Sequence, residues 1–477
     1  MAYISLDDPE IFKKKVHLSF RAWLKQDSSP EELLADLFLV QQQRRQVILQ
    51  SNLSMLRMAT NTVLERAIDQ LALQDEQGAS VLRWRFPDNE TRQEVANRIH
   101  VSEFTVSRIQ ARALEGVTAV LMEQEKRERE THAQKIASRL PAPTYTKLFG
   151  RDAVETQLFD ELMTKDSPWL VAVVGMGGIG KTALADKVVR RLIPTMRFED
   201  IIWLHADRGG LYGRNESPTL TFEQILIDLL KQIYPEAVVP PSLNDQLYKA
   251  RNALNLSPHL VIVDNLETEE DIAYMMNQLN DLTEPSKFLL TTRTLASRRS
   301  HVVNIELNQL SFAESRDFIR FHAEETGLDT VFELSDEDMY AIYELTGGNP
   351  LALIIVAGQL DTMPLSRLLS SMNHSFSNEV DEMYKRIFWQ AWKTLSDHAR
   401  QLLQAMHLVP EAADADYLLA ISGLEEGELW RAVEELRQRS LLNVSGDLQN
   451  KTYSIHPLTR TFVKSDILTS PSDTSDE

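Results

Sequence analysis

The sequence predicts a multidomain protein of the α/β plus α class, in which an α/β unit built on a parallel sheet lies between helical regions. Short β-rich apolar runs alternate with amphipathic segments between residues 147 and 297, and this alternation is typical of a parallel sheet covered on both faces. The 477-residue chain has only 17 glycines and 18 prolines, which favours long uninterrupted helices elsewhere. At roughly 150 residues per domain, this length predicts about three domains.

The composition excludes several classes of function. Asp and Glu number 70 against 50 Lys and Arg, so the net charge of −20 repels nucleic acid and anionic membrane except at a local patch. The absence of cysteine excludes disulfides, thiolate metal sites and cysteine nucleophiles. The first ten residues lack the pattern of a signal peptide, and no apolar run approaches the roughly 18 residues of a membrane span. We therefore expect a cytoplasmic protein with no membrane partner.

Residues 1–75 have the pattern of a helical region. Ser29, Pro30 and Glu32 form a capping box that opens a helix. Between residues 53 and 71, apolar side chains recur at spacings of three and four, the period of one buried helix face. Residues 123–146 comprise a charged, solvated helix and a proline-containing linker, where we place the first domain boundary.

Four apolar runs predict the strands of the sheet, at residues 169–174, 201–204, 260–263 and 288–290. Beyond about Thr294 we expect the strands to stop and helices to resume. Two short runs on either side of Ser445 and Gly446 predict a hairpin. Residues 466–477 are polar and acidic, and we expect them to form a disordered tail.

The segment from Gly175 to Thr182 matches the pattern G-x-x-x-x-G-K-[ST], directly after the first predicted strand and directly before a helical run. Glycines here let consecutive backbone N–H groups turn inward around phosphate oxygens, and the helix N-terminus adds its partial positive charge. Lys181 would reach the β and γ phosphates, and the Thr182 hydroxyl would bind Mg²⁺. We therefore expect ATP or ADP with Mg²⁺ to be bound by Gly175, Gly177, Gly178, Ile179, Gly180, Lys181, Thr182 and Ala183.

Polar residues follow the third and fourth predicted strands. Asp264 comes directly after an apolar run, which places it at the carboxyl edge of the sheet, and we expect it to hold Mg²⁺. The next residue, Asn265, cannot take up a proton, so Glu267 is the nearby candidate for a catalytic base and we expect slow hydrolysis at most. Arg293 is either a sensor of the γ-phosphate or a surface arginine at a strand end.

Taken in order, these three motifs resemble the NB-ARC branch of the STAND P-loop NTPases in its bacterial-type form, a branch that includes plant resistance proteins and apoptosome ATPases. The resemblance extends from about Leu148 to Val463. It implies a P-loop nucleotide-binding domain over residues 147–297, a helical domain over residues 298–378 and a winged-helix domain over residues 379–465. A motor-like AAA+ ATPase is disfavoured by Asn265 and by the lack of an obvious arginine finger.

Two further segments resemble family motifs that border the adenine. The resemblance implies this role for Phe149 and Arg151, which precede the phosphate-binding loop. It also implies that Pro350 packs on the adenine, although Asn349 stands where the family usually has leucine. From the residues alone, the segment that begins at Gly347 could equally form a helix stop followed by an N-cap.

The segment around His456 resembles the winged-helix motif whose histidine contacts the β-phosphate of bound ADP, although the residue could also be a hydrogen-bonded core histidine. The resemblance implies that ADP holds a closed monomer. Exchange for ATP would then free His456 and expose surfaces for self-association. It also implies an unidentified protein partner or sensor that supplies the activating signal.

Residues 91–109 resemble the helix-turn-helix of sigma factor region four, within a region that we place at residues 76–122. Ser102 would cap the second helix, Val106 and Ile109 would point inward, and His100 would take the left-handed position in the turn. Residues 79–118 contain six arginines and five acidic residues, so the segment is nearly neutral. Its charge therefore leaves both DNA and a protein open as its partner. If DNA is the partner, we expect the major groove to be contacted by Glu103, Thr105, Ser107, Arg108 and Arg112.

Overall fold

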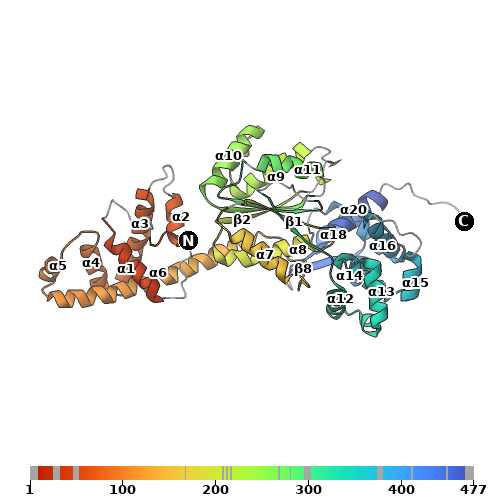
Figure 1. The fold of residues 1–477 in the computed structure, drawn as a ribbon, viewed down its shortest axis with the longest axis horizontal. Coiled ribbons are helices and arrows are strands. Elements are labelled where there is room, and N and C mark those ends of the chain that lie inside the picture. Colours follow the sequence, from red (N-terminus) through yellow and green to blue (C-terminus); the bar gives the residue numbers. More distant parts are fainter. Residues whose placement is uncertain are drawn as a thin grey trace. The chain divides into compact units, whose positions relative to one another are not determined.

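The computed structural model describes residues 9–24, 33–46, 53–166, 168–206, 209–210, 213–214, 218–266, 269–279, 281–294, 302–372, 380–409, 412–446 and 450–467. These residues fall in two compact units that divide between Ser138 and Arg139 (Figure 1). Among the described residues, no helix has both the length and the apolar character that a bilayer span needs. The predicted capping box at residues 29–32, the candidate base Glu267 and residues 468–477 lie outside this set.

The first unit is helical, as its sequence pattern predicts. Buried apolar side chains from α1, α3, α4 and α6 form its core, among them Phe12, Phe20, Leu64 and Leu121. Its helices are α1 (Pro9–Arg21), α2 (Phe38–Gln46), α3 (Leu53–Ala72), α4 (Glu76–Arg85), α5 (Arg92–Arg98) and α6 (Glu103–Ala137).

Helix α6 is a single element of 35 residues, so the region predicted to end at residue 122 and the charged helix predicted from residue 123 are continuous. Glu125, within the charged stretch that we expected to be solvated, is fully buried. Its carboxylate accepts hydrogen bonds from the backbone N–H groups of Phe38 (2.8 Å) and Leu39 (3.0 Å) and pairs with Arg129 at 2.6 Å. The carboxylate therefore caps the N-terminus of α2, which makes its burial favourable.

The second unit contains a five-stranded parallel sheet in the order β2-β5-β6-β1-β7 (Figure 1). The four predicted apolar runs are confirmed as β1 (Leu170–Val174), β2 (Asp200–His205), β5 (His259–Leu266) and β6 (Lys287–Thr292). Each of these strands is buried along nearly its whole length. A short separate pair, β3 (Gly209–Gly210) and β4 (Gly213–Arg214), lies between β2 and the next helix in the chain.

The fifth strand, β7 (Val302–Glu306), corrects the expectation that strands end near Thr294. It lies at the edge of the sheet, and among the described strands its one partner is β1. Four of its five residues are partly or fully exposed, so it lacks the continuous apolar run that marks a buried strand.

Helices cover both faces of the sheet (Figure 1). On one face α9, α10 and α11 pack on alternate strand residues such as Leu170, Ala172 and Val263. On the other face lie α7 and α8, and α8 begins at the end of the β1 loop. These helices are α7 (Asp152–Met163), α8 (Lys181–Leu192) with the 3₁₀ turn η1 (Ile193–Thr195), α9 (Pro218–Ile233), α10 (Leu243–Leu256) and α11 (Glu269–Leu279).

The remainder of the chain is helical apart from the predicted hairpin, which is present as β8 (Asn443–Gly446) paired with β9 (Lys451–Ser454). A π-helical turn η4 (Val463–Ile467) enters the first two residues of the predicted tail. The other elements are α12 (Phe312–Thr326), η2 (Asp329–Glu333), α13 (Asp336–Thr346), α14 (Pro350–Ala357), α15 (Leu365–Met372), α16 (Val380–Thr394), α17 (Asp397–Ala405), η3 (Met406–Leu408), α18 (Ala415–Ser422), α19 (Glu426–Gln438) and α20 (Pro457–Phe462).

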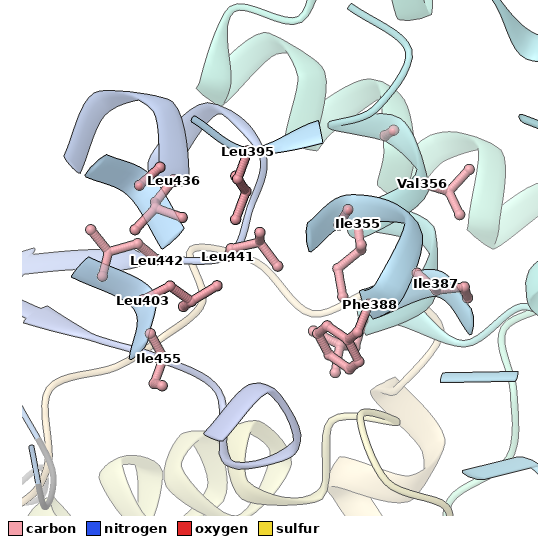
Figure 2. Close-up of a cluster of buried hydrophobic side chains, with 14 of the residues drawn as sticks. Ile355, Val356, Ile387, Phe388, Leu395, Leu403, Leu436, Leu441, Leu442 and Ile455 are labelled. Atoms are coloured by element: carbon pink, nitrogen blue, oxygen red, sulfur yellow. The ribbon is translucent and has the colours of Figure 1, made fainter. Parts of the chain in front are cut away.

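One hydrophobic core spans the regions predicted as the helical and winged-helix domains. Figure 2 shows Ile355 of α14 and Phe388 of α16 near Leu441, with Leu403 of α17 and Ile455 on the other side. Each of these side chains is at most 4% exposed. The two predicted regions are therefore packed together through apolar contacts, and Ile455, the residue before His456, belongs to this core.

Candidate functional site

The predicted phosphate-binding loop connects β1 to α8, as the sequence motif requires. Gly178 and Gly180 have φ angles of +71° and +101°, a region that side chains rarely adopt. At Gly175 and Gly178 an added Cβ would lie 2.7 Å from the Leu307 carbonyl oxygen and from the Leu351 Cβ, respectively. Backbone conformation and close packing thus both require glycine in this loop.

The two predicted Mg²⁺ ligands lie together at the carboxyl edge of the sheet. The Thr182 hydroxyl donates to Asp264 Oδ1 at 2.8 Å, and the Thr291 hydroxyl donates to the same oxygen at 2.6 Å. His205 Nδ1 lies 3.6 Å from Asp264 Oδ2. Over the part of the chain that the structure describes, no three His, Cys, Asp or Glu side chains gather into a metal cage. A hydroxyl beside one carboxylate fits Mg²⁺, which is typically bound through one or two protein oxygens, waters and phosphates.

Thr291 is a residue that the sequence analysis did not identify. Besides orienting Asp264, its hydroxyl accepts a hydrogen bond from the backbone N–H of Asn265 at 2.8 Å. Asn265 adopts a left-handed conformation with a φ of +69° at this point. The signal was present in the sequence as a polar pair, Thr291 and Thr292, that ends an otherwise apolar run.

Three predicted residues from distant parts of the chain converge beside this loop. Lys181 Nζ donates to the carbonyl oxygens of Gly175 at 2.9 Å and Met176 at 3.0 Å. Burial, together with the positive charges of Lys181, Arg293 and Arg460, lowers the pKa of His456 to about 4. His456 therefore lies within electrostatic range of the lysine of the loop and of the arginine that follows β6, and this concentration of positive charge favours an anion nearby.

Arg151 and Phe149 occupy different environments. Arg151 is buried, and its guanidinium donates to the carbonyl oxygens of Ile179 at 3.2 Å and Asn308 at 2.8 Å. It thus fastens the phosphate-binding loop to the segment after β7. Phe149 packs against Phe318 and Phe321 of α12, with ring centroids 5.6 and 5.4 Å away. The adenine contact expected of these two residues stays a prediction.

The segment before Pro350 forms a helix stop and an N-cap, the alternative left open by the sequence. Gly347 ends α13 in the left-handed conformation, and Asn349 caps α14 with Pro350 in its first turn. Asn349 is fully buried, and its Nδ2 also donates to the carbonyl oxygen of Gly177 at 2.9 Å. The sequence analysis treated this asparagine only as a tolerated departure from a family pattern and missed its contact with the loop.

The turn between α5 and α6 has the predicted local geometry. His100 has a φ of +56°, and the Ser102 side chain accepts from the Thr105 N–H. Val106 and Ile109 are buried in a small core with residues of α4 and α5. The assignment of this segment as a helix-turn-helix of the sigma type stays a prediction.

The side chains predicted to face DNA differ in their availability. Arg112 forms an ion pair with Asp75 at 3.0 Å, and the Ser107 hydroxyl donates to the carbonyl oxygen of its own helix at Glu103. The Thr105 hydroxyl lies 3.0 Å from that of Ser102 within the helix cap. Arg108 is exposed on the same helix. Arg108 is therefore the residue of this set best placed to contact a phosphate or a base edge.

Comparison with known proteins supports the interpretation of the loop and sheet. Residues 151–323 match the model of the NB-ARC domain family. The chain is 23% identical over 349 residues to the Transcription activator GutR of Bacillus subtilis, covering 68% of this chain and 40% of that protein. It is 25% identical over 251 residues to the ToMV resistance protein Tm-2(2) of Solanum lycopersicum, covering 48% of this chain and 27% of that protein.

Among solved structures, the chain is similar to a STAND protein with a tetratricopeptide repeat sensor from Pyrococcus horikoshii. The TM-score is 0.44 at 18% identity, with 68% of this chain and 43% of that chain covered. The match to this chain covers less than half the length of the Bacillus subtilis and Solanum lycopersicum relatives.

Proposed function

The chain carries an NB-ARC domain and belongs to the NB-ARC branch of the STAND P-loop NTPases, and on this premise we propose that it is an ATP/ADP-controlled signalling switch. In this proposal ADP holds a closed resting conformation. Exchange for ATP opens the molecule for self-association or for output through another protein. Such a switch needs a nucleotide whose contacts differ between the two conformations.

The convergence of Lys181, Arg293 and His456 carries the proposal. Lys181 starts α8, Arg293 follows β6, and His456 precedes α20, so one bound phosphate chain could contact three separate elements. The diphosphate of ADP would neutralise the two cations and accept a hydrogen bond from His456. A γ-phosphate adds charge and bulk at the same place, which supplies the differential contact that an exchange-driven opening requires.

Mg²⁺ would be held by Thr182 and Asp264, whose oxygens already lie 2.8 Å apart. The ion would neutralise phosphate charge at the edge of the sheet. The chain's own contribution is to orient Asp264, which Thr291 does by donating a hydrogen bond to its Oδ1 at 2.6 Å.

We expect nucleotide to remain bound through purification of the full chain, with ADP as the main species. Denaturation of the protein and chromatography of the released nucleotide measure this directly. The matched control is Lys181→Ala, which removes the cation nearest the phosphates and is expected to lose the nucleotide. A wild-type site that is empty and binds no added ADP at millimolar concentration would refute the switch.

A second candidate function is a nucleotide-controlled transcription regulator, in which α5 and α6 contact DNA. The similarity to a protein described as a transcription activator favours it, as does the predicted helix-turn-helix pattern. The exposed Arg108 lies on the face that would meet the DNA. A protein-binding role for the same helices is supported by the near-neutral charge and by the exposure of 80% of the Phe104 side chain.

We expect the Arg108→Ala variant to weaken DNA binding by roughly 10-fold, and Arg112→Ala to change it little because Arg112 is already paired with Asp75. Gel shifts at several salt concentrations with a library of duplex DNA measure both effects. The wild-type affinity should fall with added salt. A salt slope near zero, or equal effects of the two variants, would instead favour the protein-binding role.

A further inference from the structure

The carbonyl oxygens of the phosphate-binding loop all have identified hydrogen-bond donors. The Lys181 ammonium donates to the carbonyl oxygens of Gly175 and Met176. The backbone N–H of Leu184, in the first turn of α8, donates to the carbonyl oxygen of Gly180. The three carbonyls in the middle of the loop are held by groups outside it. These groups come from Arg151 and from the N-terminus of α14.

Helix α14 provides two of these outside donors. Asn349 Nδ2 donates to the Gly177 carbonyl at 2.9 Å, and the backbone N–H of Leu351 donates to the Gly178 carbonyl at 3.3 Å. The third, the Arg151 guanidinium, holds the Ile179 carbonyl at 3.2 Å. One donor therefore comes from the start of α7, and the other two come from a helix that begins about 170 residues after the loop.

In a planar trans peptide, the carbonyl of one residue points opposite to the N–H of the next. Holding the Gly177 carbonyl against α14 therefore turns the Gly178 N–H away from α14. In the same way, holding the Ile179 carbonyl against Arg151 turns the Gly180 N–H away from Arg151. The positive φ angles at Gly178 and Gly180 belong to the alternating conformations in which successive N–H groups form an anion-binding concavity.

The hydrogen bonds of Asn349 settle which end of its amide is the donor. Its Oδ1 accepts from the backbone N–H groups of Leu351 at 3.0 Å and Ala352 at 3.4 Å. The other end of the amide must then be the NH₂ group, which faces the Gly177 carbonyl. Asn349 is completely buried, with 0% of its surface exposed to solvent. A leucine or alanine there could supply neither contact.

We propose that Asn349 is a positioning residue for nucleotide phosphates, which couples the orientation of the loop's N–H groups to the docking of α14. This rests on the proposed nucleotide-binding function. When α14 is docked, the amide holds the loop in the conformation that accepts phosphate. Conversely, a bound phosphate favours the docked position of α14, since a coupling between two equilibria is reciprocal. Nucleotide binding and docking of this helix are then one equilibrium.

The test compares Asn349→Ser and Asn349→Asp with Ser335→Ala. Both Asn349 variants keep a side-chain oxygen to cap α14, but they lose the amide donor to Gly177. Ser335→Ala removes the N-cap of the neighbouring helix α13, where the Ser335 hydroxyl bonds Asp338 of its own capping box. It is the control for lost helix stability. The measurements are the Kd for Mg·ADP, the Tm without nucleotide, and hydrogen exchange of the peptide that covers residues 175–182.

We expect both Asn349 variants to raise the Kd for ADP by roughly 10-fold and to speed exchange at the loop amides in the nucleotide-free protein. Ser335→Ala should lower the Tm and leave the Kd and the loop exchange at wild-type values. Wild-type affinity and wild-type loop exchange in the Asn349 variants would overturn the proposal, as would an equal loss in Ser335→Ala.

The failure of the proposed function would look different. A wild-type chain that binds no nucleotide refutes the switch, whereas the exchange rates of the loop amides in the nucleotide-free protein still decide whether Asn349 orients the loop. Faster exchange in both Asn349 variants would support the positioning role even then, and unchanged exchange would overturn it.

Discussion

Replacement of His456 by alanine is expected to shift the chain toward the open form, so that with ATP present the variant elutes earlier from a size-exclusion column than the wild type. The imidazole lies within electrostatic range of Lys181 and Arg293, and in the proposed switch it is the contact between the C-terminal segment and the β-phosphate. Removing it eliminates a contact made only in the closed state, which shifts the equilibrium toward opening. Elution identical to that of the wild type would count against the role of His456.

The same residue gives a pH dependence whose sign follows from its pKa. In the closed conformation the pKa of His456 is about 4, below the ordinary value of 6.5, because of burial and of nearby positive charge. Between pH 6.5 and 4 the open form therefore binds more protons, and acid favours opening. For the nucleotide-free chain the shift amounts to about 2 kcal/mol at pH 5. Bound ADP should weaken this dependence, because a phosphate stabilises the protonated imidazole.

Hydrogen exchange of residues 450–462 at pH 7 and pH 5 measures this opening. His322 is the matched control, because burial also lowers its pKa to about 4 and its Nε2 lies 2.9 Å from the Ser440 hydroxyl. The His322→Gln variant should lose part of the acid sensitivity of the Tm. It should keep the acid-induced exposure of residues 450–462, which His456→Gln should lose. The reverse pattern would assign the pH response to His322.

Replacement of Gly178 by alanine is expected to weaken ADP binding by roughly 100-fold. The residue has a φ of +71°, where a side chain costs about 1 to 2 kcal/mol. The added Cβ would also lie 2.7 Å from the Leu351 Cβ and 3.1 Å from Asn349 Oδ1. Both neighbours belong to the start of α14, so the helix must move away from the loop. The hydrogen bonds that hold the Gly177 and Gly178 carbonyls would then be lost.

Gly327 offers a control with the same backbone strain and no clash. Its φ is +76°, and an added Cβ would meet no atom within 4 Å. Gly327→Ala should therefore lower stability by about 1 kcal/mol and leave the Kd for ADP unchanged. Isothermal titration with Mg·ADP and thermal unfolding of both variants separate strain from displacement of α14. Equal Kd values for the two variants would show that the contact between Gly178 and α14 is unimportant for binding.

Local sequence patterns predicted those parts of the molecule that depend on neighbours in the chain. The run that ends at Val174, followed by glycines and Lys181, is a strand, a loop and a helix, because hydrophobic period and glycine spacing act over a few residues. His100 has the left-handed conformation that the tight turn requires, and Ser102 caps α6. The edge strand β7 was not predicted, because it is partly exposed and has no continuous apolar run.

Contacts between distant residues were beyond such patterns. Sequence spacing carries no signal that Asn349 meets the Gly177 carbonyl across 172 positions, or that Glu125 caps a helix 87 residues earlier. The sequence likewise predicts Arg112 as a DNA contact, whereas the structure pairs its guanidinium with Asp75. In each case a polar group's effect depends on which donor or acceptor the fold places within about 3 Å of it.

The chain's residues alone were sufficient to predict a phosphate-binding loop, because phosphate binding relies on glycines, a lysine and a hydroxyl placed within one turn of a helix. The tertiary structure decided what surrounds that loop: His456 and Arg293 are brought to Lys181, and α14 is docked on the loop through Asn349. The physical reason is one of range. Backbone conformation is set by adjacent residues, whereas burial, pKa shifts and hydrogen bonds between elements exist only once the packed core has brought those elements together.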